Sequence, residues 1–378
     1  MPQDPTATTD VAVIGGGVIG LAVAWRAAQR GHSVCVLERG ELGAGASHVA
    51  AGMLAPVTEA DAGELALLQL GLRSARAWPQ FAAQLADAAG TDSVLRRSGA
   101  LVVARDRDEA EALDRELAVR HDLGLDVQRL LPSAARRLEP ALAPTVRLAL
   151  DVPGDHSADP RALVLALAEA ARRAGVTLRT GARVERLEHR AGRVTGVALA
   201  GGEVVRAHHV VAAAGAWSGA IDGLPRIPLR PVKGQILRLR DPAGAGLLER
   251  IVRFEGGYLV PRGDGRYVLG ATMEERGFDT TVTAGGLYAL LRDAGEVVPG
   301  VHEMVIEEMS AGLRPATPDN APVLGPSEEL AGLHWAAGHH RNGILLAPVS
   351  ADIVAGGLDG AGEPVAPAFA ARRHGVPA

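Results

Sequence analysis

The strongest structural signal in the sequence is one continuous segment near its start, Asp10-Val-Ala-Val-Ile-Gly-Gly-Gly-Val-Ile-Gly-Leu-Ala-Val-Ala-Trp-Arg-Ala-Ala-Gln-Arg-Gly-His-Ser-Val-Cys-Val-Leu-Glu38. Residues 10–14 form a short, mostly apolar run typical of a strand, and a glycine-rich turn follows at once. Residues 21–30 carry apolar side chains at helical spacing, and residues 33–37 have the pattern of a second strand. Strand, glycine turn, helix, strand and terminal acid, in this order, predict a dinucleotide-binding βαβ unit.

Each part of this unit has a physical task. Gly15 permits a tight turn, Gly17 leaves room for a pyrophosphate against bare backbone, and Gly20 lets the helix pack closely on the strand. The helix N-terminus offers unpaired N–H groups and a partial positive charge to the pyrophosphate. Glu38 can accept hydrogen bonds from both ribose hydroxyls, and its charge would repel a 2′-phosphate, which disfavours NADP. An ordinary glycine-rich turn would explain the glycines but not the acid in register.

Length and composition narrow the class of protein. At 378 residues the chain can form two domains, and 47% hydrophobic with 22% charged residues is typical of a soluble globular protein. A net charge of −5 predicts no basic surface for nucleic acid or an anionic membrane. We see no apolar run of about 20 residues and no secretory signal in the polar residues 1–9, so we expect a cytoplasmic protein. The single cysteine, Cys35, is expected to be a buried, inert thiol.

The residues after Glu38 are unusually small for a surface loop. Gly43, Gly45, Ala46 and Ser47 would let the backbone approach a ligand closely, and the Ser47 hydroxyl can donate to a phosphate. We expect residues 50–53 to start a helix aimed at the cofactor. A flexible linker is the alternative for this stretch.

The rest of the chain alternates between helical and strand patterns. Asp159 before Pro160 predicts a helix N-cap. A buried strand from His208 ends in Ala-Ala-Gly215 and is expected to run parallel beside the glycine turn, with His208 and His209 solvated before it. Further helices are predicted over 64–89, 106–123, 160–174, 286–300 and 344–356; an antiparallel meander over 176–178, 182–188, 193–199 and 203–206; further strands over 98–104, 302–313 and 333–337; and an antiparallel sheet over 227–271.

Several blocks together are similar to one family. With the opening glycine turn and Glu38, the chain resembles the FAD-dependent D-amino acid oxidase superfamily and, within it, the glycine oxidase branch of thiamine biosynthesis. The resemblance runs from about residue 10 to residue 358. The matching blocks are Gly45-Ala-Ser47, Ala51-Gly-Met-Leu-Ala-Pro56, Ala213–Ser218, Pro231-Val-Lys-Gly-Gln235, Tyr258-Leu-Val-Pro-Arg262, Gly270-Ala-Thr-Met273, Ala311–Asp319 and Gly338–Pro348.

This resemblance implies an α/β fold with a Rossmann-like FAD-binding domain of discontinuous segments and an α+β substrate domain, whose antiparallel sheet covers the flavin. The implied segments are 1–85, 147–225 and 311–378 for the FAD-binding domain, and 86–146 and 226–310 for the substrate-binding domain. The change of periodicity near Ile227 agrees with this division. The implied cofactor-binding residues are Ile14, Gly15, Gly17, Val18, Ile19, Gly20, Glu38, Arg39, Gly45, Ala46, Ser47, Gly52, Met53, Leu54, Val184, Ala214, Gly215, Trp217, Arg314, His340, Arg341, Asn342, Gly343 and Ile344.

The resemblance also assigns the substrate site. Arg314 matches the arginine that binds the substrate carboxylate, Tyr258 the tyrosine that hydrogen-bonds it, and Arg341 an arginine near substrate and flavin. Met53 and Met273 match residues that line the pocket. From the residues alone, Arg314 could form a structural salt bridge, Tyr258 could pack in the core, Arg341 could cap a helix, and either methionine could be plain core.

Other features concern the flavin. Residues 338–344 lead into the last helix, whose positive end would face the pyrimidine edge of the flavin. The backbone at Val184 would hold the adenine. His340 stands where relatives often carry an aromatic residue, and Gly256-Gly257 before Tyr258 could widen the pocket. Sarcosine oxidases hold their flavin covalently through a cysteine in the C-terminal half. The single cysteine here is Cys35, so we expect FAD to bind non-covalently. We also expect no metal site.

The implied reaction converts glycine, oxygen and water to an imine and then to glyoxylate, ammonia and hydrogen peroxide, by hydride transfer from the substrate Cα to flavin N5. Sarcosine and D-alanine are further expected substrates. The resemblance also implies thiazole synthase as a consumer of the imine and a homo-oligomer as the assembly. A sarcosine or D-amino acid oxidase or dehydrogenase of the same superfamily is the alternative. A non-catalytic FAD-binding subunit is a rival of another class.

Overall fold

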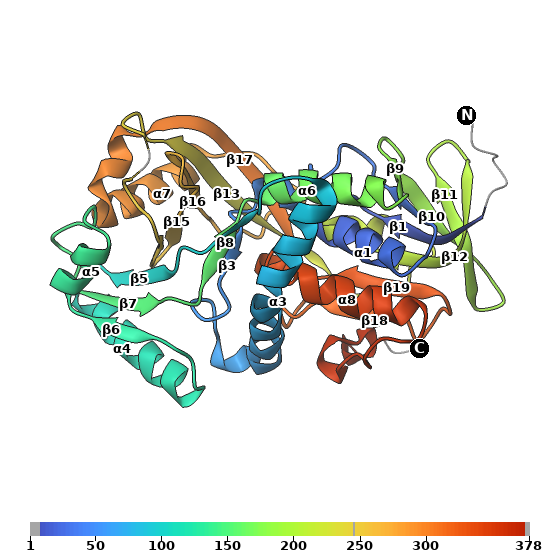
Figure 1. The fold of residues 1–378 in the computed structure, drawn as a ribbon, viewed down its shortest axis with the longest axis horizontal. Coiled ribbons are helices and arrows are strands. Elements are labelled where there is room, and N and C mark those ends of the chain that lie inside the picture. The colour runs from blue at the N-terminus through green and yellow to red at the C-terminus, as the bar shows by residue number, and fades with distance from the viewer. Residues whose placement is uncertain (1–7, 245, 375–378) are drawn as a thin grey trace.

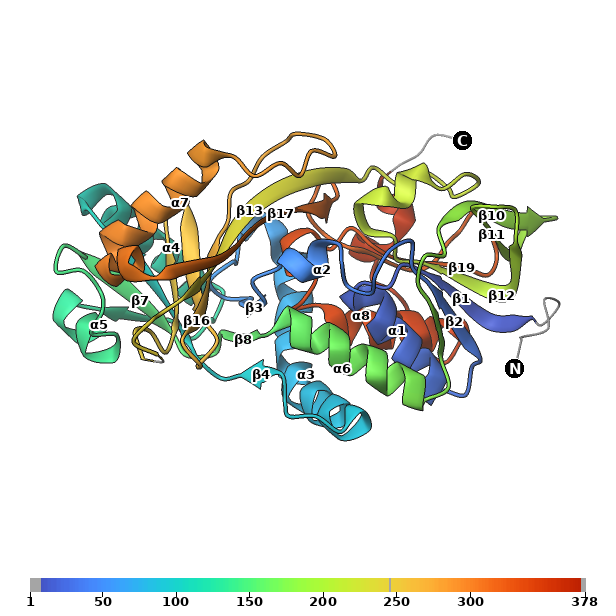
Figure 2. The same cartoon turned by 90° about the horizontal axis from the view of Figure 1, so that it is seen from above.

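The computed structural model describes residues 8–244 and 246–374, and it contains two large sheets with a small three-stranded sheet between them (Figures 1 and 2). The first sheet is formed mainly from the N-terminal residues, the middle of the chain and the C-terminal part. The second is formed from the segments between them. The two large sheets therefore interleave along the sequence, and this arrangement brings distant residues to one interface.

The first sheet has a parallel centre. Its order is β10-β11-β12-β1-β2-β9. The C-terminal half of β12 pairs with β1 along one edge and with β19 along the opposite edge. Val11 and Val13 point to the helices, while Ala12 and Ile14 pack on the opposite face, as the alternation of a strand requires. The strands are β1 (Thr9–Ile14), β2 (Val34–Leu37), β9 (Thr177–Arg179), β10 (Val184–Arg190), β11 (Arg193–Leu199), β12 (Val204–Ala212), β18 (Val323–Pro326) and β19 (Leu333–Ala337).

The predicted parallel strand beside the glycine turn is confirmed, because β12 pairs with β1 in parallel. Two details of the meander are wrong. Strand β9 pairs in parallel with β2, since the helix before it returns the chain to the same end of the sheet. The runs predicted at 203–206 and from 208 form one strand, so His208 and His209 lie within it, with His209 half-buried against His334.

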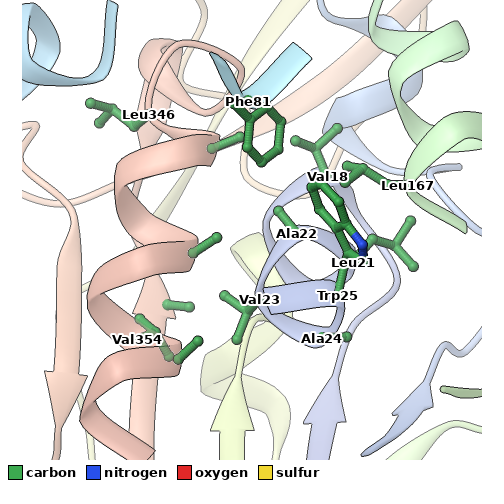
Figure 3. Close-up of a cluster of buried hydrophobic side chains, with 14 of the residues drawn as sticks. Val18, Leu21, Ala22, Val23, Ala24, Trp25, Phe81, Leu167, Leu346 and Val354 are labelled. Atoms are coloured by element: carbon green, nitrogen blue, oxygen red, sulfur yellow. The ribbon is translucent and has the colours of Figure 1, made fainter. Parts of the chain in front are cut away.

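Four helices cover one face of the first sheet and form its core (Figure 3). Trp25 and Phe81 meet edge to face with ring centroids 5.6 Å apart, and Leu21 is fully buried between neighbouring helices. The predicted N-cap is confirmed: the Asp159 carboxylate accepts from the backbone N–H of Arg161 at 2.9 Å. The four helices are α1 (Val18–Gln29), α3 (Leu65–Ala89), α6 (Pro160–Arg173) and α8 (Ala347–Leu358).

The second sheet is mostly antiparallel, in the order β17-β13-β16-β15-β14-β5-β7-β6, with β5 and β14 parallel. Residues 148–152, which the predicted boundaries place in the FAD-binding domain, pair in this sheet as β7; the division into domains stays a prediction. Its elements are β5 (Ala100–Ala104), β6 (Gln128–Leu130), β7 (Leu148–Val152), β13 (Arg230–Arg240), β14 (Ile251–Phe254), β15 (Gly257–Pro261), β16 (Arg266–Gly270) and β17 (Val305–Ala316), with helices α4 (Arg107–Asp122), α5 (Pro132–Leu138) and α7 (Ala284–Val297).

The predicted helix at residues 50–53 is wrong. A short helix, α2 (Ala46–Val49), ends before it, and Met53 pairs with Ser157 in the small sheet. Gly52 has φ +81°, and a Cβ there would lie 1.9 Å from the carbonyl oxygen of Ala158, so only glycine fits at this point. The small sheet consists of β3 (Met53–Leu54), β4 (Leu95–Arg96) and β8 (His156–Ala158).

Six short 3₁₀ helices are described at the ends of elements and near the C-terminus. In the same described ranges, none of the helices combines the length and the hydropathy needed to cross a membrane. The 3₁₀ turns are η1 (Ala62–Glu64), η2 (Gly215–Ala220), η3 (Pro299–Glu303), η4 (His340–Asn342), η5 (Pro367–Phe369) and η6 (Ala371–His374).

Candidate active site

One large cavity of about 1440 Å³ runs from the glycine turn of the first sheet to the strands of the second. It is large enough for an elongated cofactor together with a small substrate. The predicted site residues that line it are Ile14, Gly15, Gly17, Val18, Ile19, Glu38, Arg39, Gly45, Ala46, Ser47, Gly52, Met53, Val184, Ala214, Gly215, Trp217, Tyr258, Met273, Arg314, His340, Arg341, Asn342, Gly343 and Ile344.

Two predicted cofactor-binding residues, Gly20 and Leu54, are not among those that line the cavity. A Cβ at Gly20 would lie 2.0 Å from the carbonyl oxygen of Gly15, so this glycine lets α1 pack against the turn. Leu54 is buried in the core beneath the helices. Their position indicates that they support the site from behind its wall.

The glycine turn presents backbone to the cavity. Gly15 has φ +108°, and a Cβ there would lie 2.5 Å from the carbonyl oxygen of Ala213 on the neighbouring strand end. Gly17 is the N-cap of α1 and supplies no side chain, so the hydroxyl of Ser47 accepts from the N–H of Val18 at 3.0 Å. The Ser47 proton remains available to a ligand. A helix N-terminus, bare backbone and a hydroxyl donor together fit a pyrophosphate.

Glu38 is held in place by backbone. Its Oε2 accepts from the N–H of Gly16 at 2.7 Å, and its Oε1 accepts from the N–H of Gly40 at 2.9 Å. Each carboxylate oxygen retains further acceptor capacity, which suits two ribose hydroxyls. Nearby, the guanidinium of Arg39 stacks 3.7 Å from the ring centroid of Trp217.

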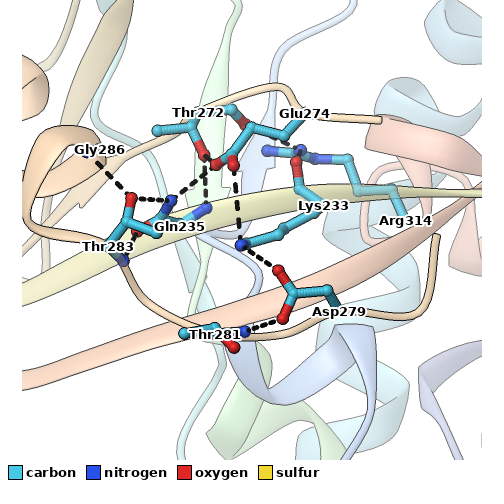
Figure 4. Close-up of polar contacts among 9 residues, drawn as sticks. All are labelled: Lys233, Gln235, Thr272, Glu274, Asp279, Thr281, Thr283, Gly286 and Arg314. Carbon is cyan, nitrogen blue, oxygen red and sulfur yellow. Dashed lines mark hydrogen bonds and ion pairs between the residues drawn. The ribbon is translucent and has the colours of Figure 1, made fainter. Parts of the chain in front are cut away.

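Arg314 on β17 lines the part of the cavity that the second sheet forms, and it lies close to Lys233 and Thr272 (Figure 4). Its Nη1 donates to the carbonyl oxygens of Thr272 at 3.1 Å and Lys233 at 3.3 Å. No ion pair of Arg314 with a carboxylate exists among residues 8–244 and 246–374, so its charge is uncompensated by the described protein. Gly234 on the paired strand makes room for the guanidinium, since a Cβ there would lie 2.4 Å from Nη1. A half-buried guanidinium without an anion favours an anionic ligand.

Tyr258 on β15 is a neighbour of Arg314. Burial raises the pKa of the Tyr258 phenol, although the positive charge of Arg314 opposes this shift. The phenol is therefore neutral at physiological pH and can donate a hydrogen bond. A guanidinium and a neutral phenol at one end of the cavity can together hold a carboxylate.

Arg341 has different surroundings from Arg314. Its Nη2 donates to Glu64 at 2.6 Å, and its Nε lies 3.3 Å from Glu59. Glu59 also pairs with Arg253 on β14 at 3.2 Å. Sequence reasoning missed Glu59, Glu64 and Arg253. The available signal was the position of Glu59, three residues after the matching block Ala51–Pro56.

His340 is the most unusual polar residue of the cavity. It is buried, it has φ +47°, and neither ring nitrogen has a hydrogen-bond partner within the part of the chain that the structure describes. Burial, reinforced by the neighbouring arginines, lowers the pKa of His340 to about 3, so its ring is neutral. A buried polar ring without partners on a cavity wall fits contact with a bound group. Its neighbour His339 is instead satisfied by Ser350 at 3.0 Å.

The two pocket methionines differ in exposure. Met53 is half-buried in β3, whereas Met273 is 68% exposed on the loop between β16 and α7. Plain core packing therefore does not describe Met273. The ring centroids of Phe278 on the same loop and of Trp217 on the turn after β12 lie 5.9 Å apart, so the loop reaches this turn.

Cys35 lies buried in β2, as predicted. Burial raises the pKa of its thiol to about 11, so the thiolate is absent at neutral pH. Within the described residues, no group of three or more His, Cys, Asp or Glu side chains is placed to hold a metal ion.

Comparison with known proteins places these observations. The profile of the family described as "FAD dependent oxidoreductase" matches residues 10–356. A glycine oxidase of Geobacillus kaustophilus is 37% identical over 351 residues, covering 92% of each chain. A bifunctional protein ThiO/ThiG of Trichormus variabilis is 38% identical over 92% of this chain and 52% of its own length.

Solved structures agree with the sequence comparisons. The crystal structure of glycine oxidase from Geobacillus kaustophilus superposes with a TM-score of 0.91 at 35% identity, covering 98% of this chain and 100% of that one. An iminodiacetate oxidase from Chelativorans sp. BNC1 superposes with a TM-score of 0.86 at 30% identity, covering 96% and 98%. The expected fold class and the resemblance to the superfamily and its glycine oxidase branch are confirmed, and FAD is the cofactor that the glycine turn, Glu38 and His340 fit. The chain belongs to the FAD dependent oxidoreductase family.

Proposed function

We propose that this protein is an FAD-dependent oxidase that converts glycine to its imine, which water hydrolyses to glyoxylate and ammonia while oxygen is reduced to hydrogen peroxide. Similarity to glycine oxidase over more than nine-tenths of both chains supports this activity. The observation that carries it is the uncompensated guanidinium of Arg314 beside the neutral phenol of Tyr258, at the far end of a dinucleotide cavity.

Arg314 and Tyr258 hold the substrate carboxylate in this proposal. Two directional contacts on one carboxylate orient the Cα–H bond, and orientation is the main service that the protein gives to such a reaction. Met53 and Met273 supply apolar side chains to the cavity wall beside the substrate. FAD, when bound, supplies the acceptor for the electrons and hydrogen that leave the substrate.

The proposed cofactor contacts follow the same cavity. The N-terminus of α1 and the Ser47 hydroxyl take the pyrophosphate, Glu38 the ribose, and the backbone at Val184 the adenine. His340 and the residues up to Ile344 lie just before α8 and contact the flavin. Cys35 is buried and its thiol is protonated, so it gives no attachment point for a covalent flavin. Acid precipitation is therefore expected to release the yellow FAD into solution.

Small substrates are favoured because one guanidinium and apolar side chains offer no polar group that would recognise a large polar side chain. We therefore include sarcosine and D-alanine as further substrates. The reactive amine is the neutral form, so the rate of flavin reduction should rise with pH as the substrate ammonium loses its proton.

The imine product suggests a downstream partner. A relative carries the names ThiO and ThiG on one chain, and our sequence covers about half of it, 52%. This supports transfer of the imine to a thiazole synthase in thiamine biosynthesis. Cytoplasmic location and a homo-oligomeric assembly stay predictions, which cell fractionation and light scattering would test.

The decisive experiment mixes the purified holoprotein anaerobically with glycine, sarcosine, D-alanine and D-proline while the flavin absorbance is followed. Fast bleaching by glycine, reversed by air with formation of peroxide, is the expected result. Bleaching by a bulkier D-amino acid alone would favour a sister oxidase. Bleaching that only an artificial dye reverses would favour a dehydrogenase, and no bleaching would favour a non-catalytic FAD-binding subunit.

A further inference from the structure

The cavity contains two kinds of arginine. Arg314 donates to two carbonyl oxygens and forms no ion pair with a carboxylate among the described residues. Arg253 and Arg341, by contrast, converge on one carboxylate: Glu59 Oε1 lies 3.2 Å from Arg253 Nη1, and Glu59 Oε2 lies 3.3 Å from Arg341 Nε. All four side chains line the cavity.

Glu59 therefore occupies the position that a ligand carboxylate would take. Each of its oxygens faces a different guanidinium, which is the arrangement that two arginines use to bind an anion. Glu64 pairs with Arg341 as well, at 2.6 Å, but Glu59 supplies the only described ion pair of Arg253. The charges of these two guanidinium groups are therefore matched by the two carboxylates paired with them.

The backbone just before Glu59 is held from both sides. The fully buried carboxylate of Asp155 accepts from the N–H groups of Val57 at 3.2 Å and Thr58 at 2.7 Å. The buried guanidinium of Arg120 donates to the carbonyl oxygens of the same two residues at 3.1 and 3.3 Å. The segment that carries Glu59 is thus fixed by hydrogen bonds in both directions.

Space for a longer substrate exists on the same side. The cavity continues beside Arg253, where Gly256 and Gly257, in the turn between β14 and β15, form part of its lining. When Arg314 binds the carboxylate of a glycine derivative, a substituent on its nitrogen can therefore extend toward the pair of arginines. Charge, and not volume alone, has to exclude an acidic substituent.

We propose that Glu59 is a specificity-determining residue that occupies a second carboxylate subsite, formed by Arg253 and Arg341, and so restricts the enzyme to substrates with one carboxylate. The excluded class is dicarboxylic N-substituted glycines, of which iminodiacetate is the simplest. The proposal rests on the proposed oxidation of glycine and N-alkyl glycines. Like charges placed together disfavour the wrong ligand strongly, which is how such a residue discriminates.

The test compares holoprotein of the wild type with Glu59→Gln, which keeps the shape and removes the charge. Anaerobic flavin reduction is measured with sarcosine and with iminodiacetate. We expect the ratio of kcat/KM for iminodiacetate to that for sarcosine to rise by about tenfold or more. A ratio unchanged in Glu59→Gln would overturn the proposal.

Two further variants separate this mechanism from a general change of charge. Glu255→Gln removes an acid from the same cavity wall, and in the described part of the chain Glu255 forms no ion pair with either arginine; its ratio should move by less than about twofold. Arg253→Ala added to Glu59→Gln should abolish the gain, because one half of the subsite is lost. A gain equal in Glu255→Gln, or one that survives loss of Arg253, would contradict the subsite.

A measurement on the wild type covers the case in which Glu59→Gln does not retain FAD. Acetate and malonate are compared as competitive ligands by their perturbation of the flavin spectrum. We expect acetate to bind about tenfold more tightly than malonate. Equal or tighter binding of malonate would refute the role of Glu59. Failure of glycine and sarcosine to reduce the wild type would instead reject the proposed function and is distinguishable from either result.

Discussion

The two ends of the cavity are built by different means. The nucleotide end uses backbone and short side chains from residues that are near one another in sequence, such as Gly15, Gly17 and Glu38. The substrate end uses long charged side chains from separate strands and a 3₁₀ turn, such as Arg314 and Arg341. Backbone geometry is encoded locally, whereas convergence of side chains depends on the pairing of distant segments. A single backbone change at the nucleotide end should therefore abolish most of the FAD affinity. A side-chain change at the substrate end should lower only the contribution of that side chain to turnover.

The largest expected effect is at the nucleotide end. In Gly15→Val the side chain would collide with the carbonyl oxygen of Ala213 at a residue with φ +108°. We expect FAD affinity to fall by more than about 100-fold, because the backbone would have to leave the pyrophosphate site. Flavin fluorescence titration of the apoprotein measures this.

Gly31→Ala is the matched control. Gly31 also has positive φ, +91°, but nothing lies within 4 Å of the Cβ position. This variant should lose about 1 kcal/mol of unfolding free energy and no FAD affinity. If both variants kept FAD equally well, the close contact at Gly15 would have no role in binding.

The next effect concerns the substrate end. Arg314→Ala should lower kcat/KM for glycine by about 100- to 1,000-fold, since a half-buried guanidinium–carboxylate contact is lost. FAD affinity should change by less than about threefold, because the nucleotide end does not depend on this side chain. Steady-state kinetics and flavin titration measure the two quantities. Normal turnover by the variant would remove Arg314 from the proposed carboxylate site.

A smaller effect tests the support beneath Glu59. Burial raises the pKa of Asp155 to about 6 in the folded protein, from an ordinary value near 3.8. The folded state therefore holds this proton more tightly than the unfolded state does. The stabilising contribution of the protonated group is fully present below about pH 4 and is lost as the pH rises through about 6.

Asp155→Asn has no proton to lose. The free energy of unfolding of the wild type minus that of the variant should therefore fall by about 2–3 kcal/mol between pH 4 and pH 7 and stay level above. Urea unfolding at several pH values gives this difference. A difference that is constant with pH would show that Asp155 titrates normally.

The smallest expected effect concerns the loop that bears Met273. Lys233 on β13 is 1% exposed and pairs with Asp279 at 2.9 Å and Glu274 at 3.6 Å, so it ties this loop to the sheet (Figure 4). Lys233→Met should cost about 1–2 kcal/mol of unfolding free energy, less than a fully buried pair because Asp279 is half-exposed. KM for glycine should rise by about two- to fivefold with kcat changed less, because Met273 on this loop lines the cavity. Kinetics with kcat reduced and KM unchanged would show that the loop is not held by this lysine.

Sequence patterns predicted the parts of the fold with strong local signals. The βαβ unit, the capped helix after Asp159 and the long helix from residue 64 depend on periodicity and on caps, and these act within a few residues. The strand at Met53 was predicted as a helix, because only contact with Ser157, about a hundred positions away, makes it extended. The parallel partner of β9 was also missed, since the direction of pairing is not a property of the strand itself.

The candidate site divides in the same way. The sequence alone predicted a dinucleotide site at residues 10–38 and, through resemblance, that Arg314 and Tyr258 belong together. Only the tertiary structure decided that Arg341 is already paired, because its partners Glu59 and Glu64 lie more than 270 positions earlier in the chain. Turns and helix ends follow from local φ, ψ and capping preferences, but the net charge at a point in space is a sum over side chains that only folding brings together.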